Sequence, residues 1–65
     1  MMNLAEALPA EQQRVRELIA IYNSIPTGSF GAAMLQLALT RAEQAAASGD
    51  VIAMLRSYEE LKGCQ

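Results

Sequence analysis

Apolar side chains recur in the first third of the chain at the spacing of one helical face. The stripe repeats every three or four residues and consists of Val15, Leu18, Ile19 and Tyr22. Pro9 suits the first turn of a helix, where its missing N–H leaves no hydrogen bond unmade. Pro26 holds the residue before it in extended geometry and so ends the helix. We therefore predict a short helix over residues 9–23, after a lead-in of residues 1–8.

A second helix is predicted over residues 29–47. Its expected buried stripe, again read from helical spacing, is Phe30, Met34, Leu37 and Ala38. Residues 42–48 are nearly all small, which lets another helix approach closely. Four large apolar residues do not fit the core stripes and are expected at the surface, where they could form a protein interface: Ile21, Ile25, Leu35 and Ile52.

The clearest boundary between two predicted helices is the tripeptide at residues 48–50. Gly49 can adopt the left-handed conformation that ends a helix, and Asp50 can cap the next one by accepting hydrogen bonds from its first amides. Residues 51–62 then show a third apolar stripe. Because so short a link forces two helices to fold back on each other, we predict an antiparallel hairpin. The fold class is all-α: one domain over residues 1–65, with a short N-terminal helix packed on this hairpin.

The size of the chain favours self-association. A core built from 65 residues supplies only about 3–5 kcal/mol, so chains of this length usually need disulfides, a metal or oligomerisation. Cys64 is the single cysteine and histidine is absent, so we expect no intrachain disulfide, no metal site and no cofactor. Since 52% of the residues are hydrophobic, the sequence predicts a homo-oligomeric helical bundle.

Charge and hydropathy restrict the classes of partner. The net charge is −2 and Lys and Arg do not cluster, which argues against binding to duplex nucleic acid. No apolar run approaches the roughly 20 residues that span a bilayer, so no membrane partner is expected. Residues 1–6 lack the basic start and apolar core of a signal peptide. With one unpaired thiol, the chain is predicted to be cytoplasmic.

The sequence is poor in catalytic chemistry, so we do not predict an enzyme. No histidine is available to activate Ser29, Cys64 has no evident base, and the adjacent carboxylates Glu59 and Glu60 point about 100° apart on a helix. The start of the second helix offers anion binding instead, because its first amides lack helical partners and glycines let a ligand approach. This candidate phosphate site consists of Thr27, Gly28, Ser29 and Gly31.

Each of these features also has a purely structural interpretation. The hydroxyls could simply cap the helix, and the glycines could simply form the turn after Pro26. Tyr22 could place its ring in the core or stack on a base. Arg41 interrupts an apolar stripe, so it could pair with a glutamate or place its charge in a cavity shared between subunits. In an oligomer, Arg14, Arg16 or Arg41 of a neighbour could complete a phosphate pocket.

Three stretches of the chain resemble small uncharacterised helical proteins of tailed phages and prophages. They lie within residues 25–62 and read IPTGSFGAAM at 25–34, AEQA at 42–45 and SGDVIAMLRSYEELK at 48–62. Small phage accessory proteins are often counter-defence factors, which bind a host protein or sequester a nucleotide immune signal. The cyclic-nucleotide sponges of phages are similar in being short, helical and oligomeric. For a phage protein, the predicted location is the host cytoplasm.

Together these observations predict a non-enzymatic, phage-type accessory binding protein. The leading hypothesis is sequestration of a phosphate-bearing small ligand, such as a nucleotide signal, at a subunit interface, by Tyr22, the 27–31 segment and Arg41. The alternative is a protein–protein inhibitor or adaptor that binds a host or phage protein through an apolar helical face. The two differ in whether a small ligand is bound at all.

Overall fold

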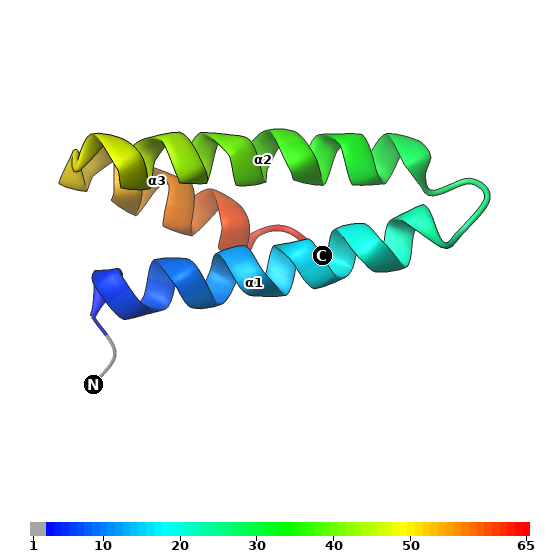
Figure 1. Cartoon of the computed structure of the whole chain (residues 1–65), viewed down its shortest axis with the longest axis horizontal. Coiled ribbons are helices and arrows are strands. Elements are labelled where there is room, and N and C mark those ends of the chain that lie inside the picture. The colour runs from blue at the N-terminus through cyan, green and yellow to red at the C-terminus, as the bar shows by residue number, and fades with distance from the viewer. Residues whose placement is uncertain (1–2) are drawn as a thin grey trace.

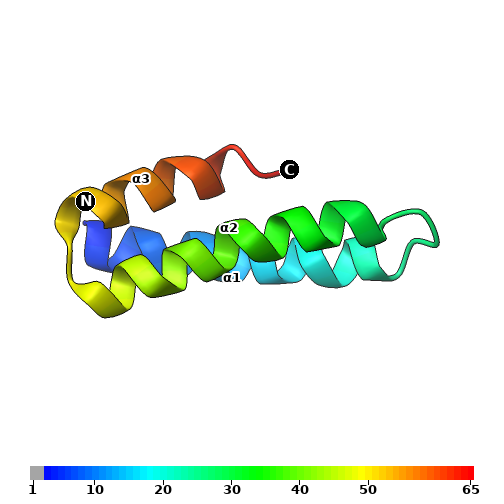
Figure 2. The same ribbon diagram turned by 90° about the horizontal axis from the view of Figure 1, so that it is seen from above.

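The computed structural model describes residues 3–65, and these fold into three helices. The helices are α1 (Leu4–Asn23), α2 (Ser29–Ser48) and α3 (Val51–Lys62). Helices α1 and α2 form an antiparallel pair about as long as the molecule, which measures 37 Å in its longest dimension (Figure 1). Helix α3 folds back beside this pair at the end away from the α1–α2 loop (Figure 2). The all-α prediction is confirmed for the described residues.

The first helix starts earlier than predicted. It begins at Leu4 rather than near residue 9, so it has 20 residues, as α2 does, and is not short. The physical reason is Asn3, whose side-chain oxygen accepts a hydrogen bond from the Glu6 N–H at 3.0 Å and caps the helix. Pro9 therefore lies in the second turn and removes a single backbone hydrogen bond. Residues 1–2 of the predicted lead-in lie outside the described residues.

The turn between α2 and α3 confirms the sequence prediction. Gly49 follows α2 with φ 72°, the left-handed conformation, and Asp50 lies before α3. The Asp50 carboxylate accepts hydrogen bonds from the N–H groups of Ile52 and Ala53, at 3.0 and 3.3 Å. Both signals are local in sequence, and each satisfies backbone groups that a helix end leaves without partners.

One apolar core lies between the three helices. Its buried members come from all of them: Leu8, Val15, Leu35, Ala38, Leu39, Ala42 and Leu61. Leu35, expected at the surface, is only 7% exposed. Phe30, Met34 and Leu37, expected in the core, are instead 77%, 49% and 52% exposed.

The lengths of the helices explain why the face of α2 that was expected in the core is exposed, and the face of Leu35 is buried. Helix α3 has 12 residues, so it covers only part of the 20-residue α1–α2 pair. Arg41 on α2 contacts Glu60 of α3, and Leu37, Met34 and Phe30 precede Arg41 by four, seven and eleven residues. At 3.6 residues per turn these positions share one face of α2. This row of apolar side chains thus points to the side of α3 but lies beyond its end.

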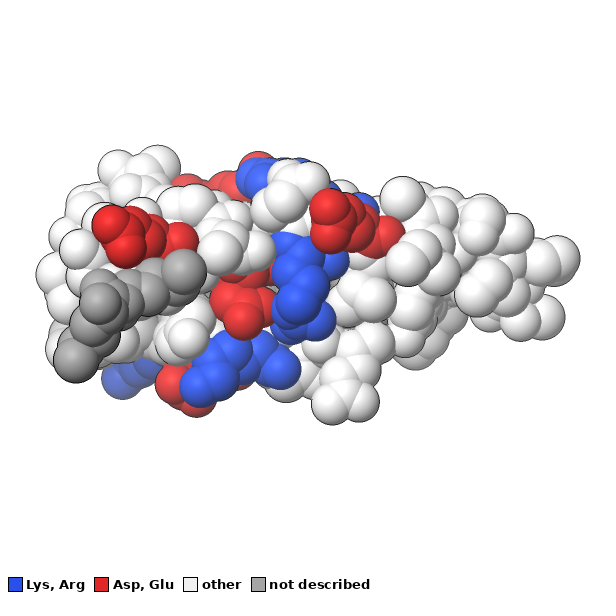
Figure 3. Space-filling model, turned by 90° about the horizontal axis from the view of Figure 1, so that it is seen from below, with Lys and Arg blue, Asp and Glu red and all other residues white. Residues whose placement is uncertain are grey.

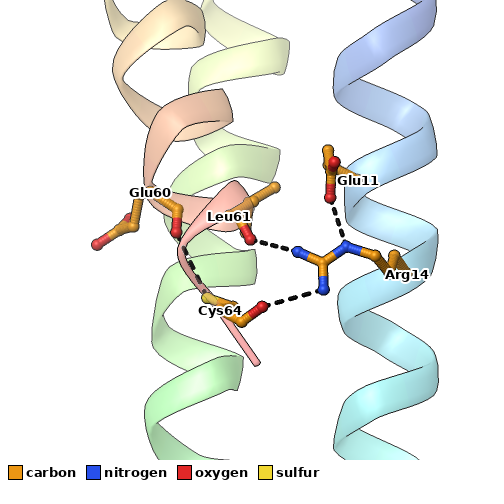
Figure 4. A network of polar contacts seen from close by, with 5 residues as sticks. All are labelled: Glu11, Arg14, Glu60, Leu61 and Cys64. Carbon is orange, nitrogen blue, oxygen red and sulfur yellow. Dashed lines mark hydrogen bonds and ion pairs between the residues drawn. The ribbon is translucent and has the colours of Figure 1, made fainter.

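Arg14 on α1 fastens the C-terminal end of α3 (Figure 4). Its guanidinium donates to the carbonyl oxygens of Leu61 and Cys64, at 2.6 and 3.0 Å, and to the Glu11 carboxylate at 2.6 Å. The last carbonyls of a helix have no helical partner, so Arg14 acts as a cap supplied by another helix. Nearby, burial raises the pKa of the Cys64 thiol, and the Glu60 carboxylate adds to the effect.

Candidate functional site

The structure brings together five of the six residues predicted to bind phosphate. Tyr22 ends α1, Thr27 and Gly28 lie in the loop of residues 24–28, and Ser29 and Gly31 begin α2. Arg41 is not among them. It lies twelve residues beyond Ser29, about 18 Å along the helix, and holds Glu60 of α3 through two hydrogen bonds of 3.1 and 2.5 Å. Within one chain, Arg41 therefore has the ion pair that its structural interpretation requires.

The two glycines of the loop region allow α1 and α2 to approach closely. A Cβ atom at Gly28 would overlap the backbone carbonyl oxygen of Tyr22. One at Gly31 would lie 2.5 and 2.6 Å from Cδ2 and Cε2 of the Tyr22 ring. The Tyr22 hydroxyl donates to the carbonyl oxygen of Gln65, so this ring packs between the start of α2 and the last residue. Packing against Tyr22 thus accounts for both glycines.

The first turn of α2 still presents backbone donors without acceptors in residues 3–65. Gly28 N–H donates to the Ile25 carbonyl, and Ala32 N–H donates to the Gly28 carbonyl, each at 2.9 Å. The three amides between them, at Ser29, Phe30 and Gly31, make no hydrogen bond to the described part of the chain. No side chain caps this helix. Such amides, at the positive end of a helix dipole, can donate hydrogen bonds to a bound anion.

The α1–α2 loop and the helical turns on either side form an uncharged tip. We define the tip as residues 18–40, a segment between Glu17 and Arg41 that holds no Asp, Glu, Lys or Arg. Figure 3 shows that charged side chains gather over the other part of the molecule on the face in view. Five large apolar side chains of the tip are between 46% and 77% exposed: Ile21, Ile25, Phe30, Met34 and Leu37.

The apolar surface of the tip is large for so small a protein. With those exposed fractions, the five residues together leave on the order of 500 Å² accessible, comparable in area with the largest patch of a typical monomer. So much exposed apolar area at one end of a molecule favours an interaction surface there. Spacing alone had placed Phe30, Met34 and Leu37 in the core. The signal that identifies the tip is the charge-free run itself, together with the shortness of the third helix.

Residues 3–65 contain no group of three or more His, Cys, Asp or Glu side chains placed to share a metal ion. None of the three helices combines the length and the apolar character that crossing a membrane requires. The carboxylates of Glu11, Glu43, Glu59 and Glu60 each take part in an ion pair.

Comparison with models of protein families, with characterised proteins and with solved structures finds no match to this chain. The resemblance to phage proteins therefore stays a prediction. What the chain does must be argued from its own geometry, and two features dominate that geometry. These are the uncharged apolar tip and the unpaired amides at the start of α2, which lie at the same end of the molecule.

Proposed function

We propose that this protein is a non-enzymatic binding protein that assembles with copies of itself through the uncharged tip. At the resulting interface it holds a phosphate-bearing small ligand, such as a nucleotide signal, against the first turn of α2. The observation that carries the proposal is the coincidence, at one end of the α1–α2 hairpin, of exposed apolar surface and backbone donors without acceptors.

Self-association through the tip is favoured by its area and its neutrality. Two copies that buried their tips against each other would cover on the order of 1,000 Å², the lower limit for a specific interface. Identical surfaces usually repel when they carry net charge, but residues 18–40 carry none. A closed symmetric pair is also the commonest arrangement of identical subunits.

The ligand half of the proposal depends on assembly. In one chain the amides of Ser29, Phe30 and Gly31 have no cation beside them, because the tip holds no Lys or Arg. A phosphate bound there would be desolvated only partly and held weakly. A second copy would exclude water from the site and could supply an arginine, and the guanidinium fork suits a phosphate.

Native mass spectrometry tests both halves, by comparing intact and denatured masses of protein purified gently from cells and then incubated with linear and cyclic nucleotides. We expect a dimer or larger assembly with extra mass of nucleotide size. Met34→Glu places a charge in the proposed interface and should leave monomers. Gln13→Glu adds the same charge to an exposed polar position of α1 outside residues 18–40 and should leave assembly intact.

The ligand half has its own variant. Ser29→Glu adds a carboxylate that competes with phosphate for the α2 amides, while the helix itself tolerates an acid at its N-terminus. We expect assemblies of this variant without the extra mass. A wild-type chain that stays monomeric at every concentration contradicts the assembly half. Assemblies that never carry a nucleotide contradict the ligand half.

A second candidate function uses the same tip for another protein. The side chains of Ile21 and Ile25 are 55% and 46% exposed, as the inhibitor or adaptor hypothesis requires, whereas Leu35 is buried and cannot contribute. Ile52 is 58% exposed but belongs to α3. This candidate predicts a monomer without a small ligand, and Ile21→Glu should abolish its binding to a partner protein.

A further inference from the structure

A pocket of about 550 Å³ lies between α2 and α3, apart from the tip. Its residues run from Arg41 to Ser48 on α2 and from Ala53 to Glu60 on α3. The small side chains of Ala45 and Ala53 are part of its wall, and they leave room that larger residues would fill. The volume is within the range of sites for small organic ligands.

One arginine of this pocket has no anionic partner in residues 3–65. Arg56 precedes Glu60 by four residues on α3, a spacing at which opposite charges usually pair. Both carboxylate oxygens of Glu60 are instead bonded to Arg41 across the pocket. Arg56 makes no ion pair or hydrogen bond with the described residues. The two arginines and Glu60 thus leave one net positive charge at the pocket.

Two further polar groups line the pocket. Ser57 lies on its wall, and its hydroxyl makes no hydrogen bond that the described residues show. No buried side-chain polar atom of residues 3–65 lacks a hydrogen-bond partner, so this hydroxyl is accessible to solvent and free to bond a ligand. The side-chain amide of Gln44 on the opposite wall is likewise unbonded within residues 3–65. Ser48 differs, because its hydroxyl donates to the Ala45 carbonyl and accepts from the Asp50 N–H.

We propose that this α2–α3 pocket binds a phosphate monoester. Arg56 supplies the guanidinium fork, and Ser57 and Gln44 donate hydrogen bonds to the remaining phosphate oxygens. Arg41 adds a second cation when the phosphate competes with Glu60 for it. Every unpaired group here can donate, which suits a ligand with three acceptor oxygens. The volume exceeds that of a phosphate group and so leaves space for an organic body.

The pocket is distinct from the site at the start of α2, and the two can be tested separately. A ¹H–¹⁵N NMR titration with inorganic phosphate and with adenosine monophosphate locates the binding residues. We expect shifts at the side chains of Arg56 and Gln44 and at the Ser57 amide, with tighter binding of the monophosphate. Arg56→Ala should weaken binding at least tenfold. Arg16→Ala removes another exposed arginine, on α1 and outside this pocket, and should leave the affinity measured from the shifts of the pocket residues unchanged.

Several results would overturn the pocket proposal. They are unchanged affinity in Arg56→Ala, equal losses in Arg56→Ala and Arg16→Ala, or no shift at millimolar phosphate. Shifts confined to residues 27–31 would overturn it too, while supporting the proposed function at the start of α2. Shifts at the pocket in a chain that never assembles would support the pocket and contradict the proposed function. Far-UV circular dichroism confirms that each variant remains helical.

Discussion

Replacing Arg14 tests whether a cap supplied by α1 holds the C-terminal end of α3. The guanidinium donates to the carbonyls of Leu61 and Cys64 and to the carboxylate of Glu11, all within 3.0 Å. Arg14→Ala removes all three hydrogen bonds at once. It leaves the Cys64 carbonyl to water, while the Leu61 carbonyl keeps only its hydrogen bond from the Cys64 N–H at 3.0 Å.

The expected loss is about 2 kcal/mol. Hydrogen bonds from a charged donor contribute roughly 1.5–3 kcal/mol when buried, but the Arg14 side chain keeps 40% exposure. We therefore assign about 1 kcal/mol or slightly less to each carbonyl, and about 0.3 kcal/mol to the part-buried i,i+3 pair with Glu11. For a chain whose core supplies about 3–5 kcal/mol, that loss lowers the Tm by roughly 10 °C.

Urea titration, monitored by circular dichroism at one protein concentration, measures the change in the free energy of unfolding. Arg14→Lys keeps the charge but can reach only one carbonyl at a time, so it should lose about half as much as Arg14→Ala. Arg16→Ala is the matched control. Arg16 lies on the same helix but meets Glu43 only at 3.7 Å with both side chains about half exposed, so its loss should be under about 0.5 kcal/mol. An Arg14→Ala variant as stable as Arg16→Ala would refute the reasoning.

Three further predictions concern the turn and the thiol. Gly49→Ala should cost about 1–2 kcal/mol in urea titrations, because φ is 72° there and no atom lies near enough to obstruct a methyl group; Gly49→Asn should cost less. Asp50→Ala should cost about 1 kcal/mol through loss of the α3 cap, while Asp50→Asn should retain most of it. Because the pKa of Cys64 is raised, less thiolate is present at pH 8, so alkylation should be slower in the folded protein than in urea and should keep rising at higher pH; equal rates would contradict this.

The parts of the fold that sequence predicted well are those with local signals. Residues 48–50 end one helix and start another through their own backbone and side chains, so Gly49 and Asp50 could be assigned without knowing the tertiary structure. The start of α1 has an equally local cap in Asn3, but a prediction that places Pro9 in the first turn assigns residues 1–8 to a lead-in.

The parts that could not be predicted depend on contacts between distant residues. Spacing identified the periodic rows of α2, but it could not say which row faces α1, since that depends on how far α3 extends. Arg14 and Leu61 are 47 residues apart, and Arg41 and Glu60 are 19 apart. No short sequence motif predicts contacts between residues so far apart in the chain. For the same reason, the sequence associated Arg41 with the start of α2, whereas in one chain it lies beside α3.

The short length of α3 also has a consequence for motion. Along the tip, two helices pack without the third, so fewer apolar contacts oppose local opening there than beside α3. Backbone amides of residues 18–36 should therefore exchange with deuterium sooner than those around Val15 and Leu61, which are fully buried. Whatever binds the tip supplies the missing contacts, and its affinity then adds to the stability of the whole chain. Binding of a partner or ligand at the tip should therefore be detectable as slower amide hydrogen–deuterium exchange at that end of the α1–α2 hairpin.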